Sequence, residues 1–132
     1  MDAIRTLNLG SWDLLLAHDR LAQDQLFSMA RERDYLLRFR GGAPDCIAIL
    51  RRDEEIGFPA ALFRKAAEAM AWDCKLPPDQ RVAIEWCCVA DAGRDPGDPP
   101  EFIRATKWHV SFVHPRPAAE PGFLENWYSE PE

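Results

Sequence analysis

Residues 82–90 have the sequence Val-Ala-Ile-Glu-Trp-Cys-Cys-Val-Ala, and the fold class depends on whether they form a helix or a strand. At helical spacing, one apolar stripe contains Val82, Trp86, Val89 and Ala90. Ile84 and Cys88 form a second stripe, which is typical of a central helix with more than one buried side. The segment also has many residues that strands favour, so a strand is the competing interpretation. We predict a helix that begins near 78–80 and places Val82, Trp86 and Val89 in the core.

Two segments nearer the N-terminus also show helical spacing. Ser11 is a suitable N-cap for a helix over residues 12–30, in which a bend near Asp19 is allowed. The apolar positions of this helix are Trp12, Leu15, Leu16, Ala22, Leu26, Met29 and Ala30. Pro59 suits the first position of the next helix. Four apolar side chains line one side of that helix: Leu62, Phe63, Ala66 and Met70.

Two further segments fit either a helix or a strand. A capping box at 98–101 favours a helix that continues through residues 102–113. In the same stretch, however, Trp108, Val110 and Phe112 alternate as they would in a strand. Segments 35–40 and 46–51 could also pair as a hairpin around Gly41-Gly42. We favour the helix over 102–113 and keep the hairpin as an alternative.

These patterns predict a mostly helical protein. We expect a single small domain of about four to five helices over residues 1–114. Residues 115–132 form a proline-rich tail that is both acidic and aromatic. The alternative is an α+β fold, with a small sheet built from segments near 35–50 and 106–113.

Composition limits the classes of function. The chain has 132 residues, of which 47% are hydrophobic, and this length is typical of one domain. Its formal net charge of −6 argues against nucleic-acid binding, which needs a basic face. No apolar run reaches the length of a membrane span, and the N-terminus lacks the pattern of a signal peptide. We therefore expect a cytoplasmic protein whose four cysteines are reduced thiols.

The sequence shows no catalytic or metal-binding motif. The candidates for such chemistry are Cys74, Cys87, Cys88, His109 and His114, and none has the close-paired spacing of metal ligands. A cysteine nucleophile paired with His109 or His114 is conceivable, but nothing nearby in the sequence activates a particular thiol. The sequence thus predicts no metal, no cofactor and no assigned catalytic residue.

The tail carries the one feature that suggests a function. Phe123, Leu124, Trp127 and Tyr128 would share one face of a short helix, and we predict that they bind a partner. The acidic residues around them favour a basic surface on that partner. The predicted function is a small, non-catalytic protein-interaction protein of the adaptor, accessory, regulatory or inhibitor (immunity) type. In a competing interpretation, the aromatic side chains cap the core of their own domain. The alternative functions are a small enzyme with an unrecognised Cys/His or carboxylate site, and a ligand-binding regulatory subunit.

Overall fold

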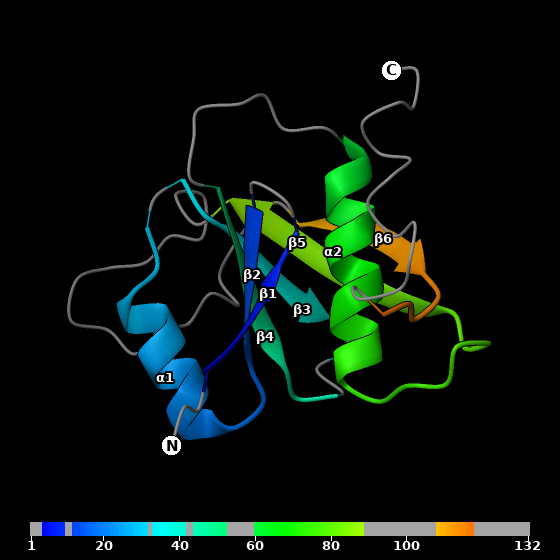
Figure 1. Cartoon of the computed structure of the whole chain (residues 1–132), viewed down its shortest axis with the longest axis horizontal. Coiled ribbons are helices and arrows are strands. Elements are labelled where there is room, and N and C mark those ends of the chain that lie inside the picture. Colours follow the sequence, from blue (N-terminus) through cyan, green and yellow to red (C-terminus); the bar gives the residue numbers. More distant parts are fainter. Residues whose placement is uncertain are drawn as a thin grey trace.

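The computed structural model describes residues 4–9, 12–31, 33–41, 44–52, 60–88 and 108–117. Within these ranges the chain forms one six-stranded antiparallel sheet and two helices (Figure 1). The elements are, in chain order, β1 (Ile4–Asn8), β2 (Trp12–Ala17), α1 (Arg20–Ser28), β3 (Tyr35–Phe39), β4 (Ile47–Arg52), α2 (Ala60–Asp73), β5 (Val82–Cys88) and β6 (His109–Val113). In space the strands are ordered β1-β2-β4-β3-β5-β6.

The sheet is the middle layer of three, because each helix covers one of its faces. Successive strand residues point to opposite faces, so Leu14 and Leu16 of β2 pack with α2 while Leu15 and Ala17 pack with α1. The α2 side of the core includes Leu62, Ala66 and Met70, and the α1 side includes Ala22, Leu26 and Phe27. The strands between the helices are therefore apolar on both faces.

The prediction of a mostly helical protein is wrong, and residues 82–90 show why. Residues 82–88 form β5, which lies between β3 and β6. Val82 and Ile84 face α2 and Cys87 faces the α1 side. A strand with apolar residues on both faces loses the simple alternation of a half-exposed strand. Its apolar positions then also fit two helical stripes. Of the predicted core residues, Val82 is buried, Trp86 is partly buried, and Val89 lies outside the described residues.

The predicted helix over 12–30 is a strand followed by a helix. The bend near Asp19 is the boundary between β2 and α1. Asp19 is the N-cap of α1, and its Oδ1 accepts a hydrogen bond of 2.8 Å from the backbone N–H of Ala22. The helix over 102–113 is also wrong for the part that is described, because 109–113 form β6. The alternation of Val110 and Phe112 was the correct signal.

Two expectations about local structure are confirmed. The amphipathic segment that contains Leu62, Phe63, Ala66 and Met70 is helix α2. The alternative hairpin is also present, since β3 pairs with β4 in antiparallel register. Gly41 in the connection has a φ of 85°, a conformation that glycine adopts without steric cost. Neither described helix combines the length and apolar character needed to cross a membrane.

Candidate thiol and histidine site

Three potentially reactive side chains meet where β2, β4 and α2 come together at one end of the sheet. Ala17, the last residue of β2, pairs with Ile47, the first residue of β4. The next residues outward, His18 and Cys46, therefore leave the sheet at the same end. Helix α2 covers this side of the sheet and ends at Asp73, directly before Cys74 (lower part of Figure 1). The fold thus brings together residues that are far apart in the sequence.

The side chains make a chain of contacts. Nε2 of His18 lies 2.8 Å from Oδ2 of Asp73, and Nδ1 of the same ring lies 3.8 Å from Sγ of Cys74. On the other side of the carboxylate, Nε of Arg5 lies 2.7 Å from Oδ1 of Asp73. One ring nitrogen of His18 and the Sγ atoms of Cys46 and Cys74 all lie within 4.8 Å of one another. We call His18, Cys46 and Cys74 the thiol–histidine cluster.

Access to solvent differs between the members of this cluster. Cys46 is buried, with 2% of its surface exposed, whereas Cys74 is half-buried. The side chain of His18 is 39% exposed, so the cluster opens to solvent on the histidine side. A reagent from solution can therefore reach Cys74 more easily than Cys46.

The two thiols also differ in acidity. A hydrogen bond from Cys46 lowers the pKa of Cys74, although burial and the charge of Asp73 act in the opposite direction. The pKa of Cys46 is raised, first by its hydrogen bond with Cys74 and then by burial. Nearby negative charges add to this increase in the pKa of Cys46. Cys74 is therefore the thiol that loses its proton first, and Cys46 is the donor that stabilises the resulting thiolate.

The end of α2 fixes the position of Cys74. The backbone N–H of Lys75 donates to the carbonyl of Trp72 at 2.9 Å, and the N–H of Leu76 donates to Ala71 at 3.3 Å. These two bonds form a Schellman motif, in which Cys74 is the C-cap. Lys75 takes the left-handed position of the motif, with a φ of 62°. Cys74 is thus held at the carbonyl end of the helix by backbone hydrogen bonds.

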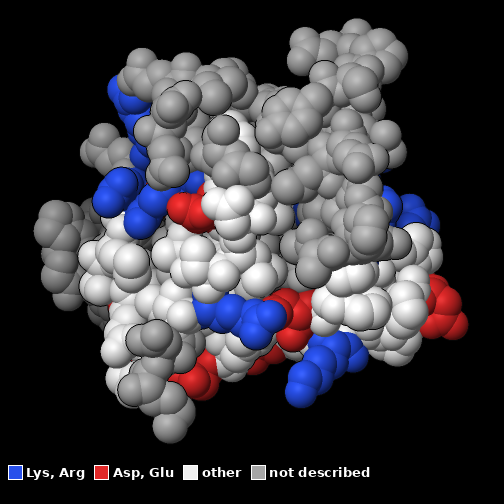
Figure 2. All heavy atoms as spheres, viewed as in Figure 1, with Lys and Arg blue, Asp and Glu red and all other residues white. Residues whose placement is uncertain are grey.

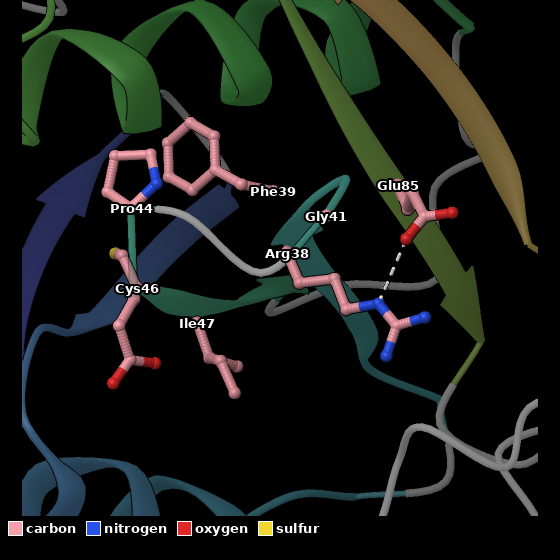
Figure 3. Close-up of a pocket in the computed structure, with 8 residues that line it drawn as sticks. Arg38, Phe39, Gly41, Pro44, Cys46, Ile47 and Glu85 are labelled. Carbon is pink, nitrogen blue, oxygen red and sulfur yellow. Dashed lines mark hydrogen bonds and ion pairs between the residues drawn. The ribbon is translucent and has the colours of Figure 1, made fainter.

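A pocket of about 400 Å³ adjoins the buried thiol. Its lining consists of Arg38, Phe39, Gly41, Pro44, Asp45, Cys46, Ile47 and Glu85. In Figure 3, Arg38 and Glu85 lie on one side of this pocket, opposite Pro44 and Cys46. Nε of Arg38 donates to Glu85 at 3.1 Å, and Asp45 accepts from Gln23 at 3.0 Å. Because these charged groups already have partners within the protein, we place the reactive chemistry at the thiols rather than in this pocket.

The structure does not bring together the residues that the sequence had suggested for metal or nucleophilic chemistry. Cys87 belongs to the core on the α1 side of β5, whereas the ring of His109 stacks on Trp86 with 4.4 Å between centroids. Cys74 pairs with His18 rather than with His109 or His114. The predicted partner-binding residues Phe123, Leu124, Trp127 and Tyr128 lie outside the described residues. Sequence reasoning missed His18, Asp73 and the role of Cys46, because no linear spacing connects them.

The surface around the site carries mixed charge. On the face shown in Figure 2, basic and acidic side chains adjoin one another at several places, and uncharged surface lies between these places. At the upper left of this view several basic side chains lie together beside an acidic side chain.

Comparison with known proteins gives a fold but no family. No protein-family model matches the chain, and no curated protein matches it. Among solved structures, it is similar to the C-terminal part of the fibronectin/fibrinogen-binding protein from Streptococcus suis (FBPS), with a TM-score of 0.65 and 18% sequence identity. The similarity covers 88% of this chain and 46% of that chain, so this chain spans less than half the length of its structural neighbour. The likeness shows a shared fold.

Proposed function

We propose that the protein is a small thiol–disulfide oxidoreductase that acts through Cys74 and Cys46. The observation that carries this proposal is the position of two Sγ atoms and a histidine nitrogen within 4.8 Å of one another. The unequal exposure of the two thiols supports it. An accessible thiol beside a buried second thiol is the arrangement in which one cysteine attacks and the other resolves.

Each residue has a defined role in this reaction. The Cys74 thiolate attacks one sulfur of a substrate disulfide, which releases the other sulfur as a thiolate and leaves a mixed disulfide on Cys74. Sγ of Cys46 then attacks Sγ of Cys74 and gives its proton to the departing sulfur, so the bound half of the substrate leaves as a thiol and a Cys46–Cys74 disulfide forms. In the tautomer whose Nε2–H donates to Asp73, Nδ1 of His18 is the acceptor that takes the proton of the Cys74 thiol. Arg5 holds that carboxylate in place.

Reaction with oxidised glutathione tests the proposal. The reduced full-length chain should form a Cys46–Cys74 disulfide without retaining glutathione, as seen by intact mass and peptide mapping. The Cys46→Ser variant should instead keep one glutathione on Cys74, because the resolving thiol is absent. Cys88→Ser is the matched control, since Cys88 is a half-buried thiol on β5 outside the cluster, and it should behave as the wild type. A wild-type chain in which Cys74 stays unmodified while Cys88 reacts would overturn the proposal.

A second function, binding to another protein, is also proposed. It is supported by the aromatic tail in the sequence and by two exposed apolar side chains on β6, Val110 and Phe112. β6 is at the edge of the described sheet, where a partner can add a strand or cover apolar side chains. The structural neighbour is itself described as a fibronectin/fibrinogen-binding protein. Deletion of residues 119–132 tests this function separately from the thiol chemistry, because the deletion leaves Cys46, Cys74 and His18 in place.

A further inference from the structure

We propose that the reduced protein binds a Zn²⁺ ion through Sγ of Cys46, Sγ of Cys74 and Nδ1 of His18. The inference uses the same three side chains as the proposed function but does not depend on their redox chemistry. It follows from four properties of the cluster: the separation of the donor atoms, the second contact of the histidine, the position at a helix end, and the kind of donor.

The donor atoms are already close to the separations that zinc requires. A zinc–sulfur bond is about 2.3 Å long and a zinc–nitrogen bond about 2.0 Å. In a tetrahedral site these bond lengths place two sulfur ligands about 3.8 Å apart, and a sulfur and a nitrogen ligand about 3.5 Å apart. In this structure Sγ of Cys74 lies 3.8 Å from Nδ1 of His18, and no pair in the cluster exceeds 4.8 Å. Small side-chain rotations are therefore enough to close the three donors around one ion.

The histidine has the second contact that metal-binding imidazoles use. A ligating histidine almost always donates its other ring N–H to a carboxylate or carbonyl, which orients the ring and fixes its tautomer. Nε2 of His18 makes this contact with Asp73, whose other oxygen is held by Arg5. The lone pair of Nδ1 is then directed toward the thiols, where the ion would lie.

The electrostatic setting favours a cation. Cys74 is the C-cap of α2, and the carbonyl end of a helix carries partial negative charge. The carboxylate of Asp73 lies beside it, with its negative charge offset in part by Arg5. Two thiolates neutralise a divalent ion, so the occupied site would place no excess charge next to the buried Cys46.

The donor set selects the kind of metal and leaves one position open. Two thiolates and an imidazole suit zinc and disfavour magnesium or calcium, which take oxygen donors. Within the described residues, no other group of three His, Cys, Asp or Glu side chains brings its donor atoms within 4.8 Å of one another. The exposed side of His18 leaves room for water or a small ligand as the fourth donor. Because the ion binds both sulfur atoms, zinc and the Cys46–Cys74 disulfide exclude each other.

Cobalt titration of the full-length chain tests the site. The protein is reduced with a phosphine, freed of metal and titrated with Co²⁺, whose thiolate charge-transfer and tetrahedral ligand-field bands report directly on sulfur coordination. We expect saturation at one ion per chain, displacement by Zn²⁺, and protection of Cys46 and Cys74 from alkylation. Asp73→Asn should keep the bands and lower the affinity by about 10- to 100-fold, as expected of a residue that positions a ligand.

Matched variants separate this inference from its alternatives. Cys46→Ser should lose most of the charge-transfer intensity, while Cys88→Ser should leave the spectrum and affinity unchanged. His18→Gln removes an exposed ligand without changing the core, so its loss of binding supports the site even where a Cys46 variant does not fold. Equal metal binding by the Cys88→Ser and Cys46→Ser variants, or absence of thiolate bands, would refute the site. The glutathione reaction contains no metal, so the redox proposal and this one can fail independently.

Discussion

The end of helix α2 offers a sharp test of the local structure that holds Cys74. Lys75 is the one described residue other than glycine with a positive φ, at 62°. A side chain in this left-handed region costs about 1–2 kcal/mol, because Cβ lies too close to a carbonyl oxygen. Glycine avoids this contact and is the residue most often found at this position of a Schellman motif. We therefore expect Lys75→Gly to stabilise the folded protein.

The magnitude follows from two opposing effects. Relief of the left-handed conformation stabilises the folded state by about 1–2 kcal/mol, whereas the greater freedom of glycine in the unfolded chain offsets about 0.5–1 kcal/mol. The expected net gain in the free energy of unfolding is about 0.5–1 kcal/mol. For a domain of this size, such a gain raises the melting temperature by roughly 2–4 °C. Because Lys75 also places a positive charge at the carbonyl end of the helix, the charge effect must be measured separately.

Lys75→Ala is the control that isolates the backbone effect. It removes the same charge but keeps Cβ, so the difference between the Gly and Ala variants contains only the two backbone effects: relief of the left-handed conformation and the greater freedom of glycine in the unfolded chain. Urea denaturation followed by circular dichroism gives both free energies of unfolding, with thermal scans as a second measurement. If the Gly variant is no more stable than the Ala variant, the Schellman assignment at Cys74–Leu76 is wrong. The position of Cys74 would then need another explanation.

Three further predictions concern the core and the tail. Asp34→Ala should lower the free energy of unfolding by about 3–5 kcal/mol in urea melts, because Asp34 is 3% exposed and its Oδ2 lies 2.7 Å from a guanidinium nitrogen of Arg51. A loss below about 1 kcal/mol would contradict a buried ion pair. Trp86→Ala should lower the free energy of unfolding by about 3 kcal/mol, because the indole stacks on Phe63 with 3.8 Å between centroids but is only partly buried. An unchanged melting temperature would show that Trp86 does not belong to the core. Deletion of 119–132 should leave the melting temperature unchanged and abolish binding in a pull-down if the tail docks on a partner. A drop of several degrees would instead place the tail on its own domain.

The sequence predicts α2 well because one side of this helix faces the sheet. The apolar residues Leu62, Phe63, Ala66 and Met70 recur at the spacing that helical periodicity detects. The strand β2 lacks such a pattern because both of its faces are buried, by α1 on one side and α2 on the other, and β5 also has buried apolar residues on both faces: Val82 and Ile84 on one, Cys87 on the other. A continuous apolar run of this kind satisfies helical spacing as easily as alternation. The error in fold class therefore comes from the three-layer architecture, which cannot be seen within one segment.

The candidate site could not be predicted for a different reason. Metal ligands and catalytic cysteines are recognised in sequences by short, regular spacings. Here His18 follows a strand, Cys46 precedes another strand, and Cys74 follows a helix. Only the pairing of Ala17 with Ile47 and the end point of α2 bring them together. The signals that could have helped were the hairpin interpretation of 35–51 and the bend at Asp19, since both place element ends near these residues.

The surroundings of the thiol–histidine cluster hold its three side chains in place. Cys46 is fixed by the core, and backbone hydrogen bonds at the end of α2 fix Cys74. His18 is exposed and depends on Asp73 for its orientation, so the carboxylate is the part of the site whose removal should loosen the ring without disturbing the core. Fixing mobile side chains costs conformational entropy, which opposes binding and catalysis. Side chains that the protein already holds in place lose less of this entropy when they bind an ion or form a disulfide than mobile side chains would. Both proposed reactions draw on the same preorganisation, and Asp73 is therefore the residue whose substitution should weaken each of them while the fold is retained.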